Sequence, residues 1–249
     1  MSVKKGVILN LSTVENETSL LHSKLGDGLN IACSSIKKLD MRGAIVSTIY
    51  DGNGVWPDEI ALDGFQYEYI NAVEEDSHLG PMTKRPASWF VNWLGRQKEF
   101  SPQPYEQCAK VLRAAGAPDK ANAVLYACKE REREQATGWR KFWLGCMKVI
   151  IGYGLGVKYF RALWWVLGLV ALGWLVALGL GETNKSWYWL LAFSLDRLLP
   201  IFSLGQEFDS QILTGWPWAY FVFLHKPLGF ILASFVVAGL AGVGRRETD

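Results

Sequence analysis

The spacing of hydrophobic positions changes twice along the chain. Over residues 6–70, apolar residues recur in pairs two positions apart, each followed by a polar stretch and a further apolar residue. Such alternation is typical of short β-strands with one buried face. The instances are Leu9/Leu11/Val14, Leu29/Ile31/Ile36, Leu39/Met41/Ile45 and Ile60/Leu62/Phe65.

The predicted strands recur at a step of about ten residues. Their first residues, Leu9, Leu29, Leu39 and Ile60, are separated by 20, 10 and 21 positions. No helical pattern lies between them, and a single short coil cannot bury its own apolar face. The sequence therefore predicts a β-solenoid of stacked short strands in the first domain, residues 1–75.

Helical spacing replaces this alternation in a second domain, residues 76–135. A short amphipathic segment at 89–94 precedes two longer helices. Pro104 marks the start of the first of these, Gly116 its end, and Asp119 the cap of the next. We expect a helical hairpin, a motif that packs or binds more often than it catalyses.

Two uncharged stretches indicate a membrane domain at residues 161–249. Residues 162–181 would form a helix about 30 Å long, enough to cross a bilayer. Residues 228–244 follow Pro227 and end before two arginines, which gives a second predicted transmembrane helix. Close packing between helices in lipid is favoured by small residues, here the glycines at 168, 173 and 179.

Between these spans, residues 187–199 have a helical stripe of leucines that Pro200 ends. About thirteen helical residues reach only about 20 Å, which is too short to cross. The segment is therefore either a re-entrant helix or an interfacial helix lying flat on the membrane. Its Asp196-Arg197 pair is either functional or a salt bridge that fixes the helix.

Residues 136–160 are predicted to form a basic amphipathic helix on the membrane surface. Trp139, Phe142, Trp143, Met147 and Ile150 lie on one helical face, and GxGxG at 152–156 is interpreted as a flexible joint. The cations expected at the membrane surface are Arg140, Lys141, Lys148, Lys158 and Arg161.

Charge and composition predict how the chain is oriented in the membrane, and they exclude two classes of protein. Residues 1–135 carry 16 basic and 18 acidic side chains, and residues 136–249 carry 10 and 6. This balance, with half of the residues hydrophobic, excludes a disordered chain and a strongly basic nucleic-acid binder. Residues 135–162 contain five cations and no acid, so the positive-inside rule places both termini in the cytoplasm.

No catalytic, cofactor or metal site is predicted. The four cysteines have neither CxxC nor zinc-ligand spacing and are expected to stay reduced. The three histidines lie in no metalloprotease motif and beside no nucleophile motif. Residues 51–54, DGNG, are interpreted as a turn.

Three segments resemble a bacterial family of β-solenoid membrane proteins. They are ALDGFQYEYI at 61–70, FSPQPYEQCAKVLRAAG at 100–116 and KERER at 129–133. Members of this family are filed as pentapeptide-repeat-like proteins or as membrane-associated oxidoreductases. The resemblance implies the bacterial inner membrane as the location, and the second label implies redox chemistry.

A second resemblance concerns the membrane domain. The order of span, AFSLDRLLP at 192–200, turn and span is similar to the two-span pore domain of potassium-type channels, where a pore helix precedes the filter. IFSLG at 201–205 stands where that family has TxGYG. The pore or re-entrant candidates within 187–205 are Phe193, Ser194, Leu195, Asp196, Arg197, Leu198, Pro200, Ser203 and Gly205.

The sequence therefore predicts a non-enzymatic inner-membrane protein. A cytoplasmic solenoid would sense a signal or bind a protein partner, and a homo-oligomeric two-span domain in the lipid bilayer would anchor it and form a pore. Two alternatives stay open: a membrane-associated oxidoreductase, and a passive membrane-anchored scaffold.

Overall fold

The structure is a computed structural model that describes residues 8–10, 15–31, 35–51, 56–72, 81–155, 160–179, 186–198 and 220–244. It combines short parallel strands with helices, as the mixed class predicted here requires. The chain forms two compact units, residues 1–141 and 142–249, and the division falls within helix α4.

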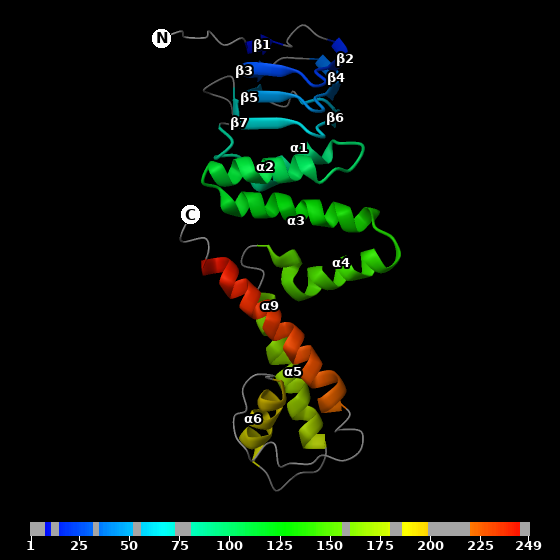
Figure 1. Cartoon of the computed structure of the whole chain (residues 1–249), viewed down its shortest axis with the longest axis vertical. Helices are drawn as coiled ribbons and strands as arrows, with labels where there is room; N and C mark the ends of the chain where they lie inside the picture. Colours follow the sequence, from blue (N-terminus) through cyan, green and yellow to red (C-terminus); the bar gives the residue numbers. More distant parts are fainter. Residues whose placement is uncertain are drawn as a thin grey trace. The chain divides into compact units, whose positions relative to one another are not determined.

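Consecutive strands of the first unit alternate between two parallel sheets (Figure 1). One sheet has the order β1-β3-β5-β7 and the other β2-β4-β6. The strands are β1 Ile8–Asn10, β2 Glu15–Ser19, β3 Lys24–Asn30, β4 Ser35–Asp40, β5 Ile45–Asp51, β6 Glu59–Ala61 and β7 Gln66–Ala72. Leu9 pairs with Leu29 and Leu39 with Ile60, so the separations of 20 and 21 residues in the sequence are pairing distances within one sheet.

The repeated apolar positions form the core of this unit. Leu29, Ile31, Leu39, Met41, Ile60 and Leu62 are all buried. Ile45 was expected to point inward, and this is wrong, because its side chain is 39% exposed and Val46 is buried instead. A shift of one residue along a strand moves a side chain to the opposite face.

Helices cover the last strands of both sheets. They are α1 Ala87–Gly95 and α2 Gln103–Ala114, and α3 Pro118–Gln135 packs against both of these helices where the helical hairpin was predicted. From α2, Gln107 Nε2 donates to the Tyr67 carbonyl at 2.8 Å, and Gln103 exchanges bonds with Gly64 N–H and the Phe65 carbonyl. In the second sheet, Gln97 forms a bridge beside Ile60.

The observed end of α2 agrees with the sequence prediction, and the observed start of α3 does not. Gly116 ends α2 with a φ of +76°, as expected for a residue just past a helix. Asp119 does not cap α3: the cap residue is Ala117 and Pro118 takes the first helical position, which leaves Asp119 in the first turn. The fixed φ of proline suits that position.

A buried ion pair lies at the end of β5. The Arg85 guanidinium donates two hydrogen bonds of 2.7 Å to the Asp51 carboxylate, and both side chains are fully buried. Trp56 Nε1 donates a third bond at 2.9 Å, and the guanidinium lies 4.4 Å from the Trp89 ring centroid. Residues 52–54 of the predicted turn lie outside the described residues.

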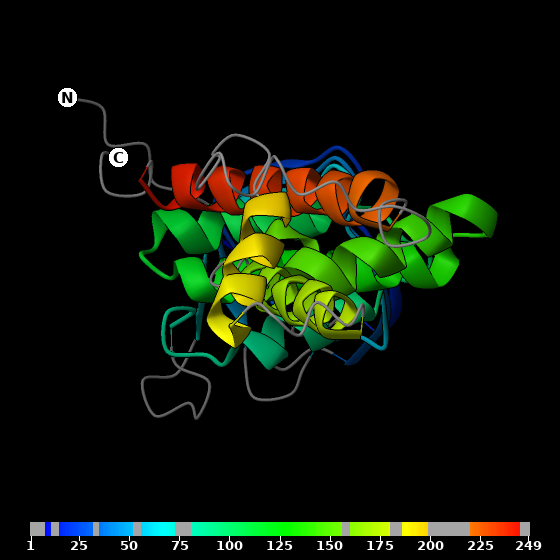
Figure 2. The same ribbon diagram turned by 90° about the horizontal axis from the view of Figure 1, so that it is seen from below.

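The second unit is helical. Its elements are α4 Gly138–Ile151, the 3-10 turn η1 Gly152–Gly154, α5 Phe160–Gly179, α6 Trp187–Leu198, the π-helical turn η3 Tyr220–His225 and α9 Lys226–Gly244. The predicted break after α4 is present, with Tyr153 at φ +62° between two glycines of positive φ. Within this unit α5 and α9 run antiparallel, and α6 lies beside both of them (Figures 1 and 2).

Two helical stretches are long and apolar enough to cross a membrane, Arg161–Gly179 and Tyr220–Val237. The second begins earlier than the predicted 228–244, because η3 continues into α9. Pro227 has no N–H for the carbonyl four residues before it, and the helix is wider just before this point.

Replacing Arg85 with methionine should strongly destabilise the first unit. Asp51 would then keep a buried charge without its partner, which costs about 3–5 kcal/mol. Lys84→Met is the matched control, because Lys84 is exposed. Amide hydrogen exchange of β5 and β7 in the full chain measures both, and equal effects of the two variants would contradict the assigned role of the pair.

Alkaline pH should also destabilise this unit. Burial raises the pKa of the Cys108 thiol to about 12 and that of Cys128 to about 11, from an ordinary value of 9.0. The folded state thus favours the protonated thiols, so their contribution is complete below pH 9 and is lost as the pH rises toward the folded-state values.

Denaturant unfolding of the full chain at rising pH checks this expectation. In Cys108→Ala the free energy of unfolding should fall less steeply with pH above pH 9 than it does in the wild-type chain. Cys146→Ala, a substitution in the other unit, serves as control. An unchanged slope in Cys108→Ala would show that this thiol does not contribute.

Candidate functional site

A cluster of polar side chains is buried among the apolar helices of the second unit. Ser194 of α6 and His225 of η3 are fully buried, and Asp196 is nearly so. Burying a polar group is costly unless it is hydrogen-bonded, so each of these side chains needs a structural or functional reason.

Hydrogen bonds connect this cluster across three elements. Ser194 Oγ donates to the Val170 carbonyl of α5 at 2.8 Å. His225 Nε2 lies 3.1 Å from the Ser194 carbonyl, and Nδ1 lies 3.2 Å from the Tyr220 hydroxyl. A carbonyl only accepts, so Nε2 carries the proton, and in a neutral ring Nδ1 accepts from Tyr220.

In this geometry His225 is not placed to activate the Ser194 hydroxyl as a nucleophile. Activation requires the base to accept a proton from the hydroxyl. Here His225 contacts the backbone carbonyl of Ser194, while the hydroxyl donates to Val170. Nor do three His, Cys, Asp or Glu side chains come together for a metal ion anywhere in the described part of the chain.

Two glycines let the helices approach closely at this cluster. A Cβ on Gly173 would overlap the Ser194 hydroxyl and come within 2.7 Å of His225 Cε1, and a Cβ on Gly229 would overlap the Leu198 carbonyl. Gly168 and Gly179 were also expected to pack closely. This is wrong for the described residues, since nothing lies within 4 Å of a Cβ at either position.

Helix α6 lies against the middle of α5. Val170 is the eleventh of the twenty residues of α5, about 15 Å along the helix from Phe160 and about 14 Å from Gly179. Ser194, the eighth residue of α6, bonds there. Nearer the end of α5, Trp174 Nε1 donates to the Trp187 carbonyl at the start of α6.

The predicted pore candidates divide by burial. Phe193, Ser194, Asp196 and Leu198 are buried, and Leu195 and Arg197 are half-buried. The Phe193 ring stacks on Trp189, and the Arg197 guanidinium lies 5.4 Å from its centroid. Pro200, Ser203 and Gly205 lie outside the described residues.

The predicted membrane-surface cations lie on α4 and at the start of α5. Arg140, Lys141 and Arg161 are exposed and Lys148 is half-buried. Arg140 pairs with Glu132 at 2.6 Å. Lys158 lies outside the described residues.

The sequence analysis did not identify His225, Tyr220 or Gly173 as a group. A histidine within an otherwise apolar stretch was the available signal, but apart from Tyr220, five residues before it, its neighbours Ser194 and Gly173 lie 31 and 52 residues away in the sequence. Only the packing of η3 against α5 and α6 brings them together.

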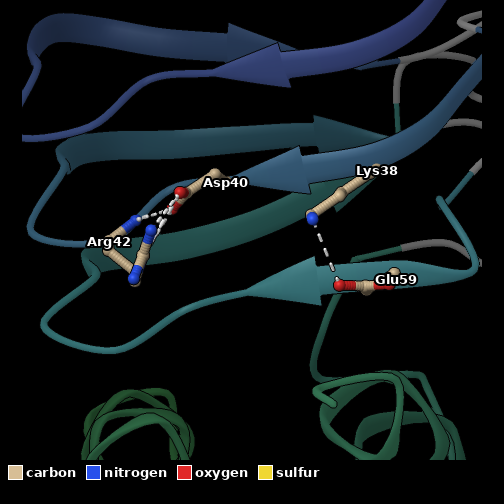
Figure 3. A network of polar contacts seen from close by, with 4 residues as sticks. All are labelled: Lys38, Asp40, Arg42 and Glu59. Atoms are coloured by element: carbon tan, nitrogen blue, oxygen red, sulfur yellow. Dashed lines mark hydrogen bonds and ion pairs between the residues drawn. The ribbon is translucent and has the colours of Figure 1, made fainter. Parts of the chain in front are cut away.

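A polar cleft of about 580 Å³ lies on the first unit, between the β4-β6 sheet and the loop after α1. Figure 3 shows Lys38 facing Glu59 across the two strands, and Arg42 hydrogen-bonded to the Asp40 carboxylate. Lys38 Nζ lies 3.5 Å from Glu59 Oε1. The Arg42 hydrogen bond lowers the pKa of the Asp40 carboxyl. Side chains of both charges alternate around this cleft. The cleft is therefore better suited to bind a polar surface of another protein than to bind an anion.

Gly173→Ala should weaken the packing of α6 against α5. The added methyl group overlaps Ser194 and His225, and overpacking of this kind costs about 1–3 kcal/mol. Gly168→Ala is the matched control on the same helix, in open space. We expect a lower unfolding temperature in mild detergent for Gly173→Ala only, and equal temperatures would contradict the close approach.

No family model matches this chain, and no curated protein or solved structure matches it significantly.

Proposed function

We propose that the chain is an integral protein of a bacterial inner membrane, anchored by α5 and α9, with both termini in the cytoplasm. The burial of these helices supports a membrane location. Only 22% of each candidate span is buried, although both are strongly apolar. A core helix of a soluble protein would be mostly covered by other elements, whereas lipid-facing helices keep their apolar surface exposed.

Helix α6 would enter the bilayer as a re-entrant helix. The observation that carries this proposal is the bond from Ser194 to Val170 at the middle of α5. If α5 spans a hydrocarbon core of about 30 Å, its middle lies near the bilayer centre, and α6 reaches that depth. An interfacial helix would instead contact only the end of α5.

The hydrogen bonds of the polar cluster fit this depth. A re-entrant segment needs its polar groups satisfied by protein, because lipid offers no partners. Ser194 and His225 have hydrogen-bond partners within the protein for their own side chains. Through the same bonds they also satisfy two backbone carbonyl groups, those of Val170 and Ser194.

The first unit would be a short β-solenoid that binds a cytoplasmic protein. Its pairing distance of 20–21 residues and the alternation between two sheets support a coil of two strands. The polar cleft beside β4 and β6 offers a surface for such a partner.

The membrane domain would assemble as a cyclic homo-oligomer around an ion pathway. One two-span chain cannot enclose a channel, so several copies are required. The residues that resemble a pore helix lie on α6, which packs against both spans; they are Phe193, Ser194, Leu195 and Leu198.

Reconstitution of the purified chain into liposomes tests this function. We expect oligomers in mild detergent and ion flux in the vesicles. Asp196→Asn should alter flux or assembly more than Glu207→Gln, because Asp196 lies in the re-entrant helix, near bilayer depth. Glu207 lies outside the described residues, in the segment between the two spans, which an orientation with both termini in the cytoplasm puts on the external side.

Two outcomes would overturn parts of the proposal. A strictly monomeric protein without ion flux would exclude the pore. Near-wild-type behaviour of both variants would favour a helix lying flat in water, where exposed charges contribute under about 1 kcal/mol.

A further inference from the structure

A cleft of about 640 Å³ lies on the first unit, between the exposed face of the sheet that contains β3, β5 and β7 and helix α2. Parallel pairing sets Lys24, Ile45 and Gln66 side by side in one row across these three strands. All three side chains are exposed, whereas Val46 and Tyr67, one position further along their strands, are buried. The cleft therefore opens on the solvent face of this sheet.

Two lysines line this cleft, Lys24 at the start of β3 and Lys110 on α2. Both side chains are exposed, and in the described part of the chain neither ammonium group has an ion pair or a hydrogen bond. The third charged residue of the lining is Glu68, whose carboxylate accepts a hydrogen bond from Ser47 Oγ at 3.1 Å. Two cations against one anion leave the lining positive.

Apolar side chains lie beside these charges. Ile45 is 39% exposed and is the cross-strand neighbour of Lys24, Leu25 is half-buried, and Val111 and Ala114 contribute from α2. Protein interfaces commonly combine an apolar centre with polar and charged groups around it, and a large side chain in such a centre supplies much of the binding free energy. The cleft offers both parts of such an interface.

We propose that this cleft binds an acidic segment of a cytoplasmic protein. An apolar side chain of that segment would lie on Ile45, and its carboxylates would lie at Lys24 and Lys110. The inference rests on the proposed partner binding by the first unit. It adds the chemistry of the partner and a site for it on the other sheet from the polar cleft beside β4 and β6.

The lining favours a protein segment over other anions. A nucleic acid carries a phosphate at every nucleotide and is bound by many cations, whereas this cleft has two, and Glu68 would repel a polyanion. A small anion such as phosphate would meet two exposed, hydrated lysines and would leave the apolar surface of Ile45 uncovered. A segment with carboxylates and an apolar side chain matches both parts of the lining.

A phage library of random dodecapeptides tests the proposal. The immobilised full chain in mild detergent is the target, and detergent-coated beads remove peptides that bind micelles. We expect the enriched peptides to carry a net negative charge and a large apolar residue. Lys24→Gln/Lys110→Gln should weaken their binding about tenfold, because two charge contacts are lost.

Charge reversal gives a contrast that a change in stability would not produce. Lys24→Glu/Lys110→Glu should invert the preference, so that the same library yields net positive peptides with an apolar residue. Ile45→Ser should weaken binding of the acidic peptides while leaving both lysines in place. Lys37→Gln/Lys84→Gln is the matched control and should retain binding, because both residues are exposed lysines of the same unit outside the cleft lining.

Four outcomes would overturn this site. Equal loss in the two double glutamine variants would indicate attraction to the overall charge of the unit. Binding that is lost in Arg42→Gln but retained in Lys24→Gln/Lys110→Gln would move the partner to the polar cleft and leave partner binding by the first unit in force. Self-association that Lys24→Gln/Lys110→Gln abolishes would make a second copy of the chain the occupant. An absence of enriched peptides would contradict partner binding by the first unit as well.

Discussion

The carbonyl groups on the outer side of β7 need hydrogen-bond donors, because β7 is the last strand of its sheet. The side-chain amide of Gln107 of α2 donates to the Tyr67 carbonyl of β7, and that of Gln103 donates to the carbonyl of Phe65, the residue just before the strand. This contact fixes α2 against the sheet, and Arg131 of α3 then donates to Tyr105 of α2 and to the Leu94 carbonyl at the end of α1. Helix α2 is thus joined to the edge of one sheet, and Arg131 joins α3 to α2 and to the end of α1.

The backbone polar groups of the second unit also need hydrogen-bond partners, but they find them in a different way. Its helices satisfy their own backbone groups, so side chains are free to join one helix to the next. Ser194 does this with a carbonyl of α5, and His225 with a carbonyl of α6. Gly173 and Gly229 allow the approach that such short bonds require.

Local patterns predicted the elements better than their partners. The apolar pairs at Leu29/Ile31 and Leu39/Met41 identified strands and core positions, and the bounds of α6 follow its leucine stripe and Pro200. Pairing between alternate strands, the burial of Asp51 against Arg85, and the meeting of Ser194 with His225 all join residues at least 20 positions apart. The 20- and 21-residue separations of the apolar pairs do correspond to the strand pairing, but no local periodicity encodes the other two contacts, because they arise from packing.

The helices at the last strands have a consequence for how the first unit can vary in length. In the proposed β-solenoid, α2 packs on β7 of the last coil and each coil pairs with the next at 20 or 21 residues, so the interior coils would be interchangeable in kind. A stack built in this way tolerates insertion or deletion of one complete turn, which would change its height by about 4.8 Å and leave the capping contacts intact. Insertion of half a turn would exchange the two faces and bring the wrong strand beneath α2. In the proposed β-solenoid, the height of the unit would therefore change only in steps of one whole turn.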